Sequence, residues 1–151
     1  MLEYGGSVEE KDGTNDMIHH TNSKPILVLD FDGVLHSYTS GWKGAGLIPD
    51  LPVKGAQKFC EDALEHFRLW IISSRCNQEG GTEAIRQWLI KYNFPPGIHV
   101  SDSGSKPPAF LTIDDRSIQF YGRFPAIKRL LTFESWVDVR KSRSTHVKKW
   151  D

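Results

Sequence analysis

The sequence predicts an α/β protein with a doubly wound, Rossmann-like and mainly parallel sheet that carries helices on both faces. Short apolar runs alternate along the chain with segments in which apolar residues recur at helical spacing. In addition, three of the four expected strands end in polar or charged side chains. Ligands of such sheets bind beyond the carboxyl ends of the strands, so we expect the functional site there.

Apolar runs predict strands at residues 26–29, 69–72, 98–100 and 109–113, with a further short edge strand at 118–121. The run Ile-Leu-Val-Leu at 26–29 shows no polar alternation, which indicates a strand buried on both faces.

Helical spacing predicts helices over residues 53–67, from Thr82 to about Tyr92, and over 124–131. Pro52 and Pro125 suit the first turns of two of these helices, and Thr82 is a candidate N-cap of the third.

A chain of 151 residues is expected to form one domain. We expect a flexible segment at 1–23, the α/β domain at 24–137 and a basic tail at 138–151. The tail could contact phosphate backbones, with Trp150 stacking on a base, or could serve only solubility. The two cysteines form no disulfide framework, and no apolar run approaches the ~20 residues of a membrane span, so a cytoplasmic protein is expected.

Seven side chains are expected to gather at the carboxyl edge of the sheet. They are Asp30, Asp32, Ser73, Arg75, Lys106, Asp114 and Asp115. Four carboxylates in one place repel one another unless a cation lies between them. Ligands that are all oxygen favour a hard ion, and Mg²⁺ is the leading choice.

Such a metal beside a lysine, an arginine and a serine suits a phosphoryl group. Ser73 and Arg75 can donate hydrogen bonds to its non-bridging oxygens, and Lys106 can neutralise charge. Asp30 and Asp32 fit two further roles: a nucleophile that forms an aspartyl-phosphate, and an acid that protonates the leaving group and then activates water.

The motifs resemble those of the haloacid dehalogenase superfamily of phosphohydrolases over about residues 24–131. The matching positions are Asp30-Phe31-Asp32-Gly33-Val34-Leu35, Ser73, Lys106 with Pro107, and Asp114-Asp115. The combination of Ser73-x-Arg75 with Asp114-Asp115-Arg116 is similar to the 3′-phosphatase domain of phage-type polynucleotide kinases.

The resemblance implies that Asp30 is the nucleophile and Asp32 the general acid/base. It implies that Mg²⁺ is bound by Asp30, the backbone carbonyl of Asp32, and Asp114 or Asp115. Ser73, Lys106 and Arg75 would contact the phosphate. A nucleotide or nucleic-acid 3′-phosphate leads as substrate, but no Gly-x-x-x-x-Gly-Lys-Ser/Thr kinase loop is present, so the leaving group stays open.

The gaps between the motifs leave no room for a cap domain, and only the loop at 36–51, with Trp42, could form a small flap. An open edge suits a large substrate or closure by a neighbouring subunit. The alternatives are a small-metabolite phosphatase, phosphotransfer to an acceptor other than water, and a non-catalytic phosphate- or metal-binding module. We expect His36 to be a packing residue and Arg116 to form a structural salt bridge.

Overall fold

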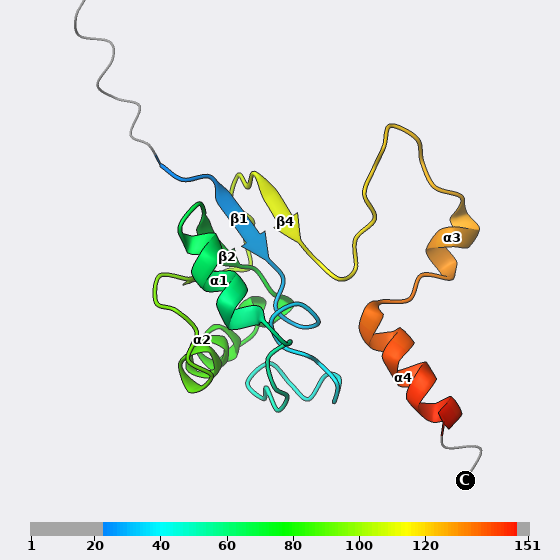
Figure 1. The fold of residues 1–151 in the computed structure, drawn as a ribbon, viewed down its shortest axis with the longest axis horizontal. Helices are drawn as coiled ribbons and strands as arrows, with labels where there is room; N and C mark the ends of the chain where they lie inside the picture. The colour runs from blue at the N-terminus through cyan, green and yellow to red at the C-terminus, as the bar shows by residue number, and fades with distance from the viewer. Residues whose placement is uncertain (1–22, 148–151) are drawn as a thin grey trace, which may run out of the picture.

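The computed structural model describes residues 23–147 (Figure 1). The predicted flexible segment at 1–23 lies almost wholly outside the described residues, and Trp150 lies outside them too. None of the helices in the described part is long and apolar enough to cross a membrane.

Four strands form one parallel sheet in the order β3-β2-β1-β4. They are β1 (Ile26–Leu29), β2 (Arg68–Ile71), β3 (His99–Val100) and β4 (Leu111–Ile113). All four residues of β1 are buried, as the apolar run predicts for a central strand. Leu29 aligns with Ile71 on one side and with Ile113 on the other, so the three strands end at the same edge of the sheet.

The helices are α1 (Ala56–Leu64), α2 (Gly81–Lys91), α3 (Ile127–Leu131) and α4 (Trp136–Val147), and a 3₁₀ turn, η1 (Ser74–Asn77), follows β2. The α/β class and the parallel sheet are therefore confirmed, and each of the four main strands lies within two residues of its predicted bounds.

One hydrophobic core lies between the sheet and the helices α1 and α2. Leu27 and Leu29 of β1 and Leu69 and Ile71 of β2 point to the same face, since they occupy alternate and aligned positions. Their cluster includes three residues of α1 and three of α2: Ala56, Cys60, Ala63, Ile85, Trp88 and Leu89. Both helices thus belong to one core, and α3 and α4 lie away from the sheet (Figure 1), so helices on both faces are not confirmed.

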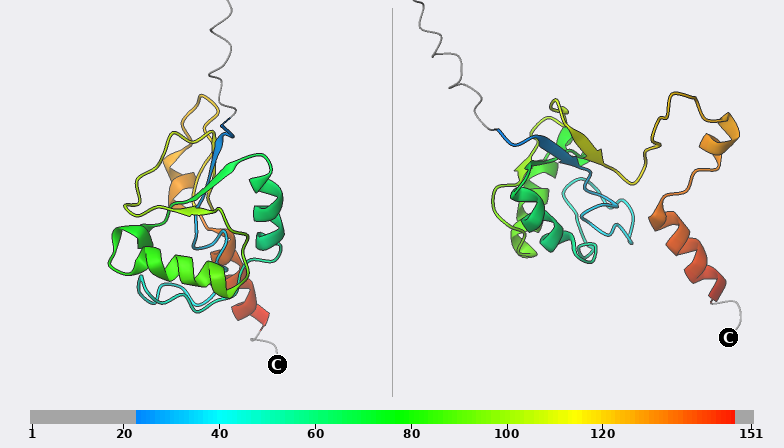
Figure 2. Two further views of the ribbon diagram at one scale, coloured as in Figure 1. Left: turned by 90° about the vertical axis from the view of Figure 1, so that its left-hand side faces the viewer. Right: turned by 45° about the horizontal axis from the view of Figure 1, so that its top comes forward.

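Two local predictions are wrong. Residues 118–121 form no strand, and the chain there leaves the sheet, as the right view of Figure 2 shows. Gly80, with a positive φ of 74°, is the N-cap of α2, while the Thr82 hydroxyl donates instead to the Ser101 carbonyl at 2.9 Å. Helix α4 runs from Trp136 to Val147, so the described part of the predicted basic tail at 138–151 is helical.

Candidate metal centre

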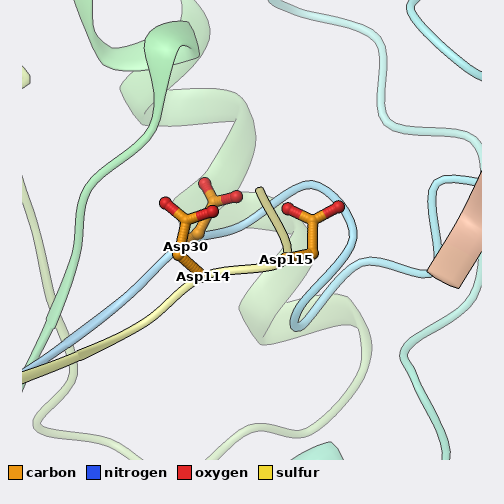
Figure 3. Close-up of side chains that lie close together, drawn as sticks. All are labelled: Asp30, Asp114 and Asp115. Carbon is orange, nitrogen blue, oxygen red and sulfur yellow. The ribbon is translucent and has the colours of Figure 1, made fainter. Parts of the chain in front are cut away.

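Three carboxylates converge where β1 and β4 end side by side. Asp30 follows β1, and Asp114 and Asp115 follow β4. The Asp30 backbone N–H donates to the Ile113 carbonyl at 2.9 Å, which continues the pairing of the two strands to the site. One oxygen from each carboxylate lies within 4.8 Å of the others (Figure 3).

Burial and mutual repulsion disfavour the charged forms of these carboxylates. The pKa of Asp30 is raised to about 8, chiefly by burial, and the charges of Asp114 and Asp115 add to the rise. The Phe31 backbone N–H, which donates a hydrogen bond to Asp30 Oδ1 at 2.8 Å, lowers the pKa and opposes the effect of burial. Burial likewise raises the pKa of Asp115, which shares a hydrogen bond with Asp30. Without a cation, burial and the neighbouring charges therefore favour a proton on this pair.

The donor set fits a hard divalent cation. Three carboxylates supply only oxygen ligands, and their spacing lets one ion contact all three, which would remove the repulsion that holds the pKa of Asp30 high. Both Asp114 and Asp115 belong to the group, so the question of which of them binds the metal directly stays open.

Gly33 permits the close packing of this centre. Its φ of +84° lies in the left-handed region, which favours glycine. A Cβ at Gly33 would also collide with the Asp115 carboxylate. The glycine of the first motif is thus needed both for the turn after β1 and for the position of Asp115.

The Asp32 carboxylate is not part of this group of three and contacts Arg75. Arg75 donates from Nε to Asp32 Oδ2 at 2.8 Å and from Nη2 to Oδ1 at 3.0 Å. Burial alone would raise the pKa of Asp32, but hydrogen bonds from His36 and Arg75 outweigh it and lower that pKa. The Asp32 side chain therefore does not belong to the group of three carboxylates. The binding of Mg²⁺ by the Asp32 backbone carbonyl stays a prediction.

Arg75 is fully buried, and protein groups surround its guanidinium. Its Nη1 donates to the carbonyls of Gly44, Ala45 and Leu47 at 2.7–3.2 Å, and the Trp42 ring lies 4.6 Å from the guanidinium carbon. Arg75 therefore joins the loop at 36–51 to Asp32. The predicted contact between Arg75 and a phosphate stays a prediction.

His36 is buried as expected and extends the network of Asp32. Its Nδ1 lies 2.8 Å from Asp32 Oδ1, and its Nε2 accepts from the Asp50 backbone N–H at 3.2 Å. This pair of contacts favours the neutral tautomer with the proton on Nδ1, although an Asp50 carboxylate oxygen also lies 3.4 Å from Nε2. We assign that tautomer because the backbone N–H can only donate.

Ser73 and Lys106, the other predicted phosphate ligands, differ in position. Ser73 is buried at the end of β2, beside β1, and its hydroxyl accepts from the Arg75 backbone N–H at 3.2 Å. Lys106 is exposed and forms no ion pair or hydrogen bond with any other described residue. The structure thus places Ser73 at the carboxyl edge but does not join Lys106 to the carboxylates.

Trp136 is a neighbour of the centre that the sequence did not indicate. Its indole Nε1 donates to the Gly33 carbonyl at 2.6 Å, and it lines a hollow with Gly33, Asp114 and Asp115. Arg116 forms the expected salt bridge, 3.0 Å from Asp138 of α4. Helix α4 therefore meets the centre through these two contacts.

The fold and this site together define an α/β protein with a candidate metal centre at the carboxyl edge of a parallel sheet. Comparisons of the chain with protein-family models, curated proteins and solved structures found no match.

Proposed function

We propose that this protein is a Mg²⁺-dependent phosphomonoesterase of the haloacid dehalogenase type, with a doubly wound, capless domain. The observation that carries the proposal is the separation of two kinds of carboxylate at one edge of the sheet. Asp30 lies with Asp114 and Asp115 in a group that suits a metal, whereas Asp32 lies apart, held by Arg75 and His36. The two aspartates of the first motif thus have different environments: a bound cation would favour the charged form that a nucleophile needs at Asp30, and the hydrogen bonds to Asp32 favour its carboxylate, the form that accepts a proton from water.

In the proposed reaction, an Asp30 carboxylate oxygen attacks phosphorus and the bond to the leaving oxygen breaks. Because hydrogen bonds from Arg75 and His36 favour the charged form of Asp32, the less populated protonated form gives its proton to that oxygen; the resulting carboxylate then takes a proton from the water that hydrolyses the aspartyl-phosphate. Mg²⁺, when bound by Asp30 with Asp114 or Asp115, supplies neutralisation of the phosphate charge. The substrate we favour is a nucleotide or nucleic-acid 3′-phosphate, in a cytoplasmic setting.

One observation favours a second candidate, a non-catalytic metal- or phosphate-binding module. Lys106 was expected to contact the phosphate, but it is exposed and has no partner among the described residues. No contact within the described part of the protein therefore holds the Lys106 ammonium group at the carboxylates.

The test is phosphate release with Mg²⁺ or EDTA from a 3′-phosphorylated oligonucleotide, a 5′-phosphorylated one, mononucleotides and sugar phosphates. We expect Mg²⁺-dependent release that Asp30→Asn abolishes and that Glu79→Gln, an exposed carboxylate elsewhere, leaves unchanged. Full activity of Asp30→Asn would contradict the mechanism. Mg²⁺ binding without release from any substrate would favour the binding module.

A further inference from the structure

The segment between β4 and α4, residues 117–134, carries apolar side chains that the rest of the described chain leaves exposed. Figure 1 shows this segment, which we call the arm, leaving the sheet after β4 and returning only at α4. Tyr121 and Leu131 are 81% exposed and Phe124 is 87% exposed. The rings of Phe120 and Phe124 lie 5.1 Å apart, so the aromatic side chains form one surface. Exposed apolar surfaces of this kind usually mark an interaction site.

Both ends of the arm are held beside the metal centre. Arg116, just before the arm, forms its ion pair with Asp138 at 3.0 Å. Trp136, just after the arm, donates its hydrogen bond to the Gly33 carbonyl at 2.6 Å. The arm is therefore a loop with fixed ends that presents its apolar side chains outward, and a connection of this length is uncommon in a compact domain.

The same molecule has an apolar groove that no described residue fills. Its volume is about 220 Å³, and it lies where the end of β4, the start of α1 and the chain after β1 meet. Its apolar lining includes Leu29, Val34, Leu35, Val53, Phe59 and Ile113. A dry apolar cavity of ~150 Å³ already takes a benzene molecule, so the groove has room for a phenylalanine ring.

The arm and the rim of the apolar groove carry opposite charges. The chain has no Asp or Glu between residues 116 and 133, and three exposed cations of the arm form no ion pair with a described residue: Arg123, Lys128 and Arg129. On α1, the exposed acids Glu61 and Glu65 follow the groove residue Phe59. These charges favour contact of an arm with a groove and oppose contact between two arms.

We propose that the arm of one copy of this chain docks in the apolar groove of a second copy, so that two copies exchange arms in a closed dimer. At ~200 Å² for each aromatic side chain, Phe120, Tyr121 and Phe124 present about 450 Å² of exposed surface. Two arms with matching groove surface then bury about 1,800 Å², within the ~1,200–2,000 Å² of stable interfaces. A second copy is favoured over a membrane because a membrane would cover the arm and leave the groove unfilled.

Sedimentation velocity of the full chain over a range of concentrations tests the inference. The unaltered protein should sediment as a dimer at micromolar concentration. Phe124→Asp in the arm and Phe59→Glu in the groove should each raise the dimer dissociation constant at least tenfold, because an aromatic anchor is lost. Ile90→Asp is the matched control and should leave the dimer intact, since Ile90 is 68% exposed on α2, outside the arm and the groove.

Mixing the two variants separates an arm in a groove from an arm against an arm. The Phe124→Asp protein keeps an intact groove and the Phe59→Glu protein keeps an intact arm, so an equimolar mixture should form a heterodimer with one intact contact. Capture of one variant by a tagged copy of the other measures this. A mixture that stays monomeric while the unaltered protein dimerises would overturn the assignment of the groove.

A second groove variant guards against a Phe59→Glu protein that fails to fold. Lys54 is an exposed cation in the lining of the groove, so Lys54→Glu should tighten the dimer by removing its repulsion of the cationic arm. A weaker dimer in Lys54→Glu would contradict docking of the arm there. An unaltered protein that stays monomeric at ~100 μM would overturn the inference, because interfaces of this area bind at micromolar concentration or below. Binding of that monomer to anionic vesicles, lost in Phe124→Asp, would assign the arm to a membrane surface instead.

Discussion

Asp32 receives three hydrogen bonds from two side chains that can fix its orientation: two from Arg75 and one from His36. A bidentate guanidinium holds a carboxylate in one plane, which a lysine ammonium cannot do. Under the proposed function, Arg75 is therefore a positioning residue that acts through Asp32.

Arg75→Lys should lower kcat for a phosphomonoester about 10²-fold, at the lower end of what a positioned general acid contributes, with little change in KM. Steady-state kinetics measure both constants. Arg86→Lys is the matched control, because Arg86 pairs with Asp102 on the surface at 2.7 Å. A large rise in KM with kcat unchanged would instead show that Arg75 binds the phosphate.

Gly33 offers a test of the metal centre that separates backbone strain from steric collision. Gly33→Ala places a methyl group against the Asp115 carboxylate in a left-handed conformation, with φ at +84°. Gly55→Ala imposes similar strain, with φ at +87°, but its Cβ would meet no atom within 4 Å. Each variant should lose about 1–2 kcal/mol in the free energy of unfolding from the strained backbone.

Only Gly33→Ala should also weaken Mg²⁺ binding, measured by calorimetry. Equal Mg²⁺ affinities of the Gly33→Ala and Gly55→Ala proteins would show that Asp115 does not need its present position to bind metal.

These residues also show which parts of the site the sequence could predict. The convergence of Asp30, Asp114 and Asp115 was predictable, because carboxyl ends of neighbouring parallel strands meet at one edge. The partners of Arg75 were not, since the loop carbonyls that surround it come from residues about 30 positions away in sequence. Backbone carbonyls carry no residue-specific signal, so no motif indicates them.

Among the helices, α4 is the one that the sequence did not predict. Its sequence, Trp-Val-Asp-Val-Arg-Lys-Ser-Arg-Ser-Thr-His-Val, has no apolar stripe at helical spacing, so periodicity could not predict it. Contacts at its start replace a buried face: Ser135 and Val137 are buried, and Trp136 donates to the Gly33 carbonyl. The α1 and α2 segments, by contrast, have such stripes and were predicted.

Trp136→Phe should therefore loosen α4 while it keeps most of the aromatic packing. Loss of the indole donor leaves the Gly33 carbonyl without this bond and should lower the free energy of unfolding by about 1 kcal/mol. Proteolytic cleavage at the start of α4 should also become faster. Trp42→Phe is the control, because the Trp42 ring packs on the Arg75 guanidinium. Unchanged cleavage in Trp136→Phe would show that this hydrogen bond does not hold the helix.

For the complete chain, the parallel sheet was predictable because its strands are short apolar runs that end in polar groups. Helices on both faces were not confirmed. The segment from Ile118 to Leu131, which was expected to add a strand at 118–121 and a helix at 124–131, has exposed side chains at Phe120, Tyr121 and Phe124 and forms only the short helix α3. The apolar residues at 118–121 predicted an edge strand that the segment does not form.

The acidic centre should also set how the stability of the whole fold depends on pH. Burial and the neighbouring carboxylates raise the pKa of Asp30 from 3.8 to about 8, and the pKa of Asp115 is raised as well. At pH values between 3.8 and about 8, the folded chain holds a proton on Asp30 that the unfolded chain has lost. The free energy of unfolding of the metal-free protein should therefore fall as pH rises from about 5 to 8. Asp32, Asp50 and Asp138 have lowered pKa values. Their contribution to the free energy of unfolding is lost only in more acidic solution, so it does not mask the fall in stability between pH 5 and 8.

Thermal unfolding in EDTA across this pH range measures the effect. Asp30→Asn should flatten the slope because Asn has no proton to lose, whereas Glu79→Gln, which changes an exposed carboxylate, should retain it. Mg²⁺ should raise the melting temperature most at pH 8, where the carboxylates are charged and repel one another, and less at pH 5, where protons compete with the metal. A melting temperature that rises with pH in EDTA would mean that Asp30 and Asp115 do not share a proton in the folded protein.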